Sequence, residues 1–206
     1  MAKYQKYAEC KDSGAQWLGK IPLSWTKSYF KYLLKFSPCY GILKPDQYTG
    51  GDAVPVIRIV DIDKQSIDID QLEYVSPKLS NEYNRTILNE GDLIVSVVGT
   101  IGKTFIANSI TAGMNLSRSL ARIQTKTIDQ TYFLKWLINS SVFHDYINVS
   151  CSGTAQKVLN METLSNWSIP LPSIVEMVKI TNFLDYKTAK IDSLIEKQQQ
   201  LIQLLK

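Results

Sequence analysis

The chain has 206 residues, of which 45% are hydrophobic and 20% charged, and its formal net charge is +4. This length suits one well-cored domain with an appendage rather than two full domains, and no apolar run approaches the length of a membrane span. The polar start lacks a signal-peptide core and the three cysteines are far apart, so we expect a cytoplasmic protein with reduced thiols.

The first part of the chain mixes loops with short elements. Residues 11–25 contain two tryptophans between glycines and a proline, which predicts a surface segment whose aromatic rings dock on the core. Residues 28–36 place apolar side chains on one face and predict a short helix. The alternation in residues 53–63 predicts a strand, and that in residues 67–70 predicts a second, half-exposed strand.

Asp61 and Asp63 also invite a calcium interpretation, because they are two residues apart. An EF-hand loop, however, needs glycine where this chain has Ser66 and a bidentate glutamate where it has Leu72. A solvated strand face is therefore the favoured interpretation of these aspartates.

The apolar run from Leu93 to Val98 predicts a central strand, and a glycine-rich stretch, residues 99–104, follows it. This stretch resembles a phosphate-binding P-loop, but Val97 stands where that motif needs its first glycine. The residues after it predict a strand, whereas the P-loop requires a helix. We expect a tight turn that presents Thr100, Lys103 and Thr104 at the surface, where they are available to DNA phosphates.

A polar turn, residues 115–119, precedes a predicted strand at residues 120–123, and helical spacing predicts a helix over residues 129–147. The single histidine, His144, has no cysteine or carboxylate at ligand spacing, so a surface histidine is expected. Residues 148–160 form a polar loop around Gly153. In this loop Gln156 is suited to an adenine edge, although an ordinary connection between elements explains the composition equally well.

The C-terminal stretch changes character at Ser173. Prolines keep residues 168–172 extended, and Ser173 with Glu176 fits a capping box at the start of a long helix. Apolar residues then recur at alternating spacings of three and four, which is the seam of a coiled coil. The residues predicted to bury themselves against a partner helix are Ile180, Leu184, Ile191, Leu194, Ile195, Leu201, Ile202 and Leu205. The alternative is a terminal helix packed on its own domain.

Four of these stretches, in this order, resemble specificity subunits of type I restriction-modification systems. They are residues 11–25, residues 91–103 (GDLIVSVVGTIGK), residues 153–160 (GTAQKVLN) and residues 168–206. Members of that family commonly have an Asn-Gln-Ser-like triplet where this chain has Leu116 in the middle position. The resemblance implies an α/β (α+β) target recognition domain at residues 1–172 and a long helix at residues 173–206 for dimerisation and spacing.

The resemblance also implies a function. Family members usually carry two such units, so a chain with one resembles a half-subunit that homodimerises to recognise a palindromic bipartite site in double-stranded DNA. Catalysis, with its adenosylmethionine, ATP and magnesium, is expected in partner modification and restriction subunits, and no cofactor or metal in this chain. The residues expected to contact DNA are Thr100, Lys103, Thr104, Ser117, Arg118, Ser152, Thr154, Gln156 and Lys157.

Two other function classes remain open at this stage. One is an enzyme that uses residues 99–104 on nucleotides. The other is a coiled-coil assembly protein, or an inactive half-subunit, that never binds DNA. Charge favours neither, since residues 1–45 carry eight basic and two acidic residues whereas residues 46–92 carry four and ten. This uneven distribution permits an anionic partner on one face.

Overall fold

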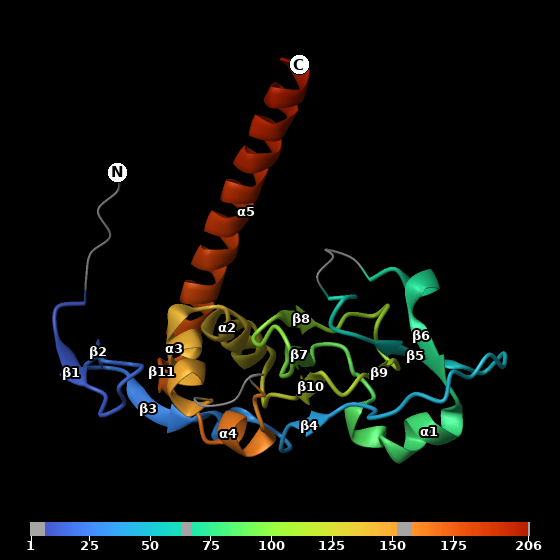
Figure 1. The fold of residues 1–206 in the computed structure, drawn as a ribbon. Coiled ribbons are helices and arrows are strands. Elements are labelled where there is room, and N and C mark those ends of the chain that lie inside the picture. The colour runs from blue at the N-terminus through green and yellow to red at the C-terminus, as the bar shows by residue number, and fades with distance from the viewer. Residues whose placement is uncertain (1–6, 63–66, 152–157, 206) are drawn as a thin grey trace.

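The computed structural model describes residues 7–62, 67–151 and 158–205, which form a mixed α/β body and one projecting helix (Figure 1). The largest sheet is antiparallel and has the strand order β4-β10-β7-β8. Its strands are β4 (Cys39–Tyr40), β7 (Leu93–Ser96), β8 (Thr104–Ile106) and β10 (Leu120–Ile123). The prediction of a central strand from the apolar run at Leu93 is therefore confirmed.

Three smaller sheets surround this one. In one of them the middle strand pairs antiparallel with one neighbour and parallel with the other. Its strands are β6 (Glu73–Val75), β5 (Val54–Ile57) and β9 (Asn115–Leu116). The other two are antiparallel pairs, formed by β1 (Cys10–Asp12) with β2 (Lys20–Pro22) and by β3 (Thr26–Tyr29) with β11 (Ser168–Leu171).

The helices cover the edges and ends of these sheets (Figure 1). The α-helices are α1 (Pro77–Glu82), α2 (Ile128–Ile138), α3 (Ser141–Ser150), α4 (Met161–Ser165) and α5 (Ile174–Leu204). Three short 3₁₀ helices connect other elements: η1 (Phe30–Leu33), η2 (Ile69–Gln71) and η3 (Asn84–Thr86). No described helix has the length and apolar character that crossing a membrane requires.

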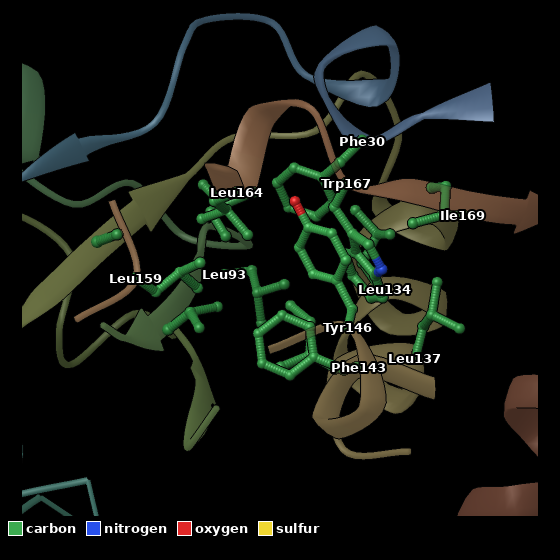
Figure 2. Packing of buried hydrophobic residues seen from close by; sticks show 14 of the residues in the cluster. Phe30, Leu93, Leu134, Leu137, Phe143, Tyr146, Leu159, Leu164, Trp167 and Ile169 are labelled. Atoms are coloured by element: carbon green, nitrogen blue, oxygen red, sulfur yellow. The ribbon is translucent and has the colours of Figure 1, made fainter. Parts of the chain in front are cut away.

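The two faces of the largest sheet line separate hydrophobic clusters. Side chains alternate along a strand, so Leu93 and Val95 of β7 face one cluster while Ile94 faces the other. In the first cluster three aromatic rings surround Trp167, whose ring centroid lies 4.9 Å from that of Phe143, 5.8 Å from that of Phe30 and 5.9 Å from that of Tyr146 (Figure 2). Phe143 and Tyr146 come from α3, Phe30 from η1, and Trp167 directly precedes β11, so this cluster fixes these three parts of the chain relative to the sheet.

The N-terminal segment docks through its aromatic side chains, as predicted. The Trp17 indole N–H donates to the Ser168 carbonyl at 3.0 Å, which ties residues 11–25 to β11. The Tyr7 hydroxyl donates to the Glu176 carboxylate at the start of α5, and this hydrogen bond raises the pKa of Tyr7 to about 12. The start of the described chain is therefore tied to the base of the long helix.

Helix α5 begins where the sequence predicts. The Ser173 hydroxyl accepts a hydrogen bond from the Glu176 amide at 3.3 Å, which is one half of the predicted capping box. Met177 and Thr181 are buried, and Trp136 of α2 donates to the Asp185 carboxylate at 2.8 Å. The remaining turns point away from the body (Figure 1), and from residue 189 onward every described residue is exposed. At 1.5 Å per residue, the 31 residues of α5 span about 46 Å.

Several predicted elements are wrong in detail. Residues 28–36 form the end of β3 and the 3₁₀ helix η1, not an α-helix. Residues 67–70 do not form a strand, because the Asp68 carboxylate accepts from the Asp70 amide and starts η2. The predicted helix over residues 129–147 is two helices, since α2 ends at Ile138 and α3 begins at Ser141.

The predicted strand at residues 53–63 is also too long. Strand β5 ends at Ile57, where the Arg58 amide donates to the Asp61 carboxylate at 2.8 Å and the Asp61 amide donates back to the Arg58 carbonyl at 3.0 Å. The Arg58 guanidinium also pairs with Asp61 at 3.0 Å. Asp61 therefore closes a turn with an arginine. Asp63 lies outside the described residues.

Candidate nucleic-acid interface

The glycine-rich stretch at residues 99–104 is a tight turn between β7 and β8, and Ser96 holds it. The Ser96 hydroxyl donates to the Thr100 carbonyl at 2.5 Å and accepts from the Lys103 amide at 2.8 Å. The Ser96 main chain bonds Lys103 and Gly102 at 2.9 and 3.0 Å. Because strand β8 follows the turn where a P-loop requires a helix, the nucleotide-enzyme interpretation of this stretch is wrong.

Gly102 lets this turn approach helix α3 closely. Its φ is +94°, and a side chain there would lie 3.1 Å from the Phe143 ring. Thr100 is exposed at the tip, whereas Lys103 is half-buried. The Thr104 hydroxyl accepts from the Asn139 side-chain amide at 2.7 Å, so this side chain faces α2. The turn therefore presents Thr100 outward and Thr104 toward the helices.

The second segment, residues 117–119, lies at the same end of the sheet. The Val97 amide donates to the Ser119 carbonyl at 2.8 Å, which joins this turn to the end of β7. The hydroxyls of Ser117 and Ser119 lie 3.0 Å apart. The Arg118 side chain is exposed and makes no ion pair or hydrogen bond with any described residue. Leu116, which departs from the family triplet, is fully buried in β9.

The third segment joins the same place through its described flanks. Ser152, Thr154, Gln156 and Lys157 lie outside the described residues. On one flank, the Cys151 thiol donates to the Val158 carbonyl at 3.6 Å. On the other, the Leu159 amide donates to the Val97 carbonyl at 2.9 Å, and Val158 forms an antiparallel bridge with Val98.

Residues 97 and 98 therefore connect all three segments. They lead directly into the first turn, and Val97 bonds both Ser119 of the second segment and Leu159 beside the third. The topology brings together the first segment and residue 158 beside the third, which are more than fifty residues apart in the sequence. We refer to the exposed part of residues 99–104, 117–119 and 158 as the candidate interface.

Lys44 is a basic residue beside this interface that was not predicted from the sequence. Ile42 forms a β-bridge with Ser117, and the Arg118 amide donates to the Ile42 carbonyl at 3.0 Å. Lys44 comes two residues after Ile42 in the sequence and therefore lies close to the turn at residues 117–119. Lys44 is exposed and forms no ion pair with any carboxylate in the described part of the chain. The available signal was Gly41, where a side chain would lie only 2.0 Å from the Leu116 carbonyl oxygen. Such a glycine marks a close backbone approach.

The candidate interface offers binding groups rather than catalytic ones. Its described polar side chains are hydroxyls and basic groups, which suit phosphates and base edges. Across residues 7–62, 67–151 and 158–205, no three His, Cys, Asp or Glu side chains gather closely enough to hold a metal ion. His144 is exposed and lies edge-on to Phe143, with ring centroids 6.3 Å apart.

The fold and this arrangement of turns define the class of protein. Residues 27–204 match the family model described as the type I restriction modification DNA specificity domain, so the chain belongs to that family. The resemblance seen in the sequence is thereby confirmed, and the family is one of specificity domains and not of enzymes, as expected.

Individual relatives agree with this assignment. The specificity subunit of the type I restriction enzyme EcoBI from Escherichia coli is 31% identical over 182 residues, which cover 86% of this chain and 38% of that protein. A structure concerning complex assembly and conformational transition of the type I R-M system matches with a TM-score of 0.68 and 19% identity, over 93% of this chain and 44% of that one.

A third match is the HsdS subunit from Thermoanaerobacter tengcongensis, with a TM-score of 0.62 and 18% identity, over 92% of this chain and 42% of that one. These two structural matches establish the shared fold, a mixed α/β body followed by a long helix. The chain thus spans less than half the length of the relatives it matches.

Proposed function

We propose that this chain recognises a DNA sequence on behalf of a type I restriction-modification complex. The observation that carries the proposal is the family match over residues 27–204. The candidate interface supports it physically, because three separate segments converge and present Thr100 and Arg118 outward. In this proposal Lys103 and Lys157 hold phosphates, while Arg118 and Gln156 contact base edges. Thr104, Ser117, Ser152 and Thr154 complete the set, and Lys44 adds a phosphate contact.

Chemistry on the DNA is then the task of partner proteins. Modification subunits would bind adenosylmethionine and methylate the base, and a restriction subunit would use ATP and magnesium to cut. This chain would act in the cytoplasm, where its DNA is. Its own contribution is to bind one sequence more tightly than others and so determine where the partners act.

Arg118 provides the test of base recognition. Its guanidinium can pair with two acceptors on a guanine, so Arg118→Ala is expected to weaken binding to the cognate site by about 1–3 kcal/mol and to relax preference at one position of each half-site. The measurement is selection from random-sequence DNA with the modification subunit present. Lys126→Ala, which removes an exposed basic residue near the other end of β10, is the matched control. If Arg118→Ala keeps full preference everywhere, the turn at residues 117–119 does not contact bases.

We further propose that α5 pairs with α5 of a second copy. Beyond its buried base, this helix exposes large apolar residues along one stripe, with Ile191, Leu194 and Leu201 each 53–57% exposed. Ile195 and Ile202 widen the stripe and are exposed to a similar extent, and Leu205 near the end of the helix is 86% exposed. Contiguous apolar surface of this kind marks an interaction site.

The positions of the polar seam residues favour an antiparallel pair. Spacings of three and four along the seam also pass through residues 187 and 198, which are Lys187 and Gln198 instead of apolar residues. An antiparallel pair centred between residues 192 and 193 places Lys187 of one copy opposite Gln198 of the other. The same register sets Ile191 against Leu194, Leu184 against Leu201 and Ile180 against Leu205. Each of these six apolar residues then meets an apolar partner.

A parallel pair in register is less favourable. It would place Lys187 of both copies against each other within the seam, where two like charges repel strongly. The antiparallel pair has one kind of unfavourable contact, between Lys190 and Lys197 on its exposed flank, which the two-fold symmetry repeats once. Such an exposed contact costs only a few tenths of a kcal/mol. Phe183 and Leu204, both exposed in this chain, meet on that same flank.

Engineered cysteines would distinguish the two orientations. A chain carrying Leu184→Cys and Leu201→Cys is expected to form a disulfide-linked dimer on mild oxidation, because the antiparallel register sets these positions opposite each other. A chain carrying Leu194→Cys alone should link to itself only if the helices are parallel. The double variant also links in a parallel pair, through its like positions, so cross-linking of Leu194→Cys to itself is the outcome that would contradict the proposed register.

The antiparallel pair has a consequence for the DNA site. Its two-fold axis relates the two candidate interfaces, so both half-sites must have the same sequence in inverted orientation. The proposed target is therefore palindromic and bipartite, with a spacer set by the length of α5. A different half-subunit as natural partner would instead give an asymmetric site in the same selection.

A further inference from the structure

A second concave site lies at the other end of β10 from the candidate interface. It is a hollow of about 380 Å³ lined by Phe36, Cys39, Asn84, Arg85, Arg122 and Gln124, among others. Residue 118 precedes β10 and residue 124 follows it, so at about 3.3 Å per strand residue the two sites are roughly 20 Å apart. The hollow is thus separate from the site proposed to recognise the duplex.

The floor of this hollow is fixed by a hydrogen-bond network. Arg122 pairs with the buried Asp92 carboxylate at 2.6 Å and donates to the Arg85 carbonyl at 3.0 Å. The Arg85 guanidinium donates to the Ser37 carbonyl at 3.0 Å, which holds the two walls together. The hollow is therefore formed before any ligand arrives.

The rim carries groups that the fold does not use. Phe36 is 65% exposed, although a large aromatic ring usually packs inside. The side-chain amides of Asn84 and Gln124 make no hydrogen bond to any residue that the structure describes. Arg122 is neutralised by Asp92, but Arg85 faces no carboxylate among the described ion pairs. One positive charge, two amides and one ring are left available.

These groups match the chemistry of an unpaired nucleotide. Unstacked bases are bound by stacking on aromatic rings or guanidinium planes and by hydrogen bonds to their edges, for which side-chain amides offer a donor and an acceptor together. Arg85, whose charge no carboxylate neutralises among the described ion pairs, adds guanidinium donors for phosphate besides the one bonded to Ser37. A volume of about 380 Å³ is at the small end for ligand sites, which suits one nucleotide.

We propose that this hollow binds a single unpaired nucleotide, with its base against Phe36, its edge on Asn84 or Gln124 and its phosphate on Arg85. The nucleotide can be free in solution or an unpaired base of a DNA strand, since the same groups recognise both. This site goes beyond recognition of a paired duplex and does not depend on it.

Cys39 provides a direct readout, because its thiol lines the hollow and is half-buried. Alkylation of each cysteine is followed by mass spectrometry, with and without dAMP, dGMP, dCMP or dTMP at millimolar concentration. Bound nucleotide is expected to slow alkylation of Cys39 in a saturable way while leaving the exposed Cys10 unchanged. Two further arms use a DNA duplex with one unpaired base and the same duplex fully paired.

Variants identify the contacts. Phe36→Ala removes an exposed ring and should weaken nucleotide protection of Cys39 by about 5- to 150-fold, the range found when a base loses its stacking partner. In the unchanged protein dAMP should protect Cys39 from alkylation more strongly than deoxyadenosine does, because Arg85 holds the phosphate. In the Arg85→Gln variant the two should protect equally. Tyr32→Ala, which removes an exposed aromatic ring outside the hollow, is the matched control and should change nothing.

The outcomes separate clearly. Protection by free nucleotides, or by the duplex with the unpaired base but not by the paired one, supports the proposal and identifies the source of the nucleotide. Absence of protection in all arms overturns it, and so does equal protection by inorganic phosphate, which would make the hollow a simple anion site. Protection by the paired duplex alone would place the hollow in a duplex interface and also overturn it. If the whole protein does not bind any DNA duplex, the proposed function is contradicted, but the experiment with free nucleotides still tests the hollow.

Discussion

Replacing Leu194 and Leu201 with glutamate is expected to convert the proposed dimer into a folded monomer. Each leucine is more than half exposed in the single chain, so neither supports the body. In the antiparallel pair both are buried against the second copy, and burial of a leucine contributes about 1.5–3 kcal/mol. Two leucines on each of two helices are lost, which should raise the dissociation constant by at least about 10⁴-fold.

Light scattering at micromolar concentration measures this change, with circular dichroism to verify that the variant is folded. Val175→Glu is the matched control, because Val175 is 67% exposed but lies off the stripe. That variant should remain dimeric. A monomeric parent protein at the same concentration would remove the main support for pairing through α5.

Truncating Trp167 to alanine should cause a large loss of stability in the body. Its side chain is fully buried among Phe30, Phe143 and Tyr146 (Figure 2), and an emptied aromatic site of this size costs about 3–5 kcal/mol. For a protein of this length the midpoint of thermal unfolding should fall by about 10 °C. Calorimetry or thermal circular dichroism gives the shift.

Trp167→Phe separates packing from hydrogen bonding at the same site. The Trp167 indole N–H has no hydrogen-bond partner among the described residues, and a buried unsatisfied donor costs about 1–3 kcal/mol. Phenylalanine removes that cost together with part of the apolar contact, so its net effect should be much smaller than that of alanine. An equal loss for both variants would mean that the N–H is satisfied in solution.

Elements with a strong local signal could be predicted from the sequence. Strand β7 was recognisable from its unbroken apolar run, and the start of α5 from Ser173 and the prolines before it. The break between α2 and α3 was not, because both helices pack on the same core and the apolar spacing continues across Asn139 and Ser140. At residues 67–70 the alternation was misleading, since the Asp68 side chain competes with a strand by bonding the Asp70 amide.

The candidate interface could be predicted in part. Glycines and polar residues identified each of its three segments, but their convergence on Val97 depends on long-range pairing that no local pattern encodes. Lys44 was missed for this reason. The hollow beside Phe36 was missed as well, because its walls come from four separate segments held together by Arg85 and Arg122.

The support beneath the turn at residues 99–104 bears on how such a protein acquires new targets. Ser96 and main-chain atoms hold the turn, while the exposed Thr100 and Arg118 side chains make no hydrogen bond to any described residue. Substitutions at these two positions therefore carry almost no folding penalty. The surface chemistry at these positions can therefore change while the scaffold stays intact, and under the proposed function such changes would alter sequence preference alone.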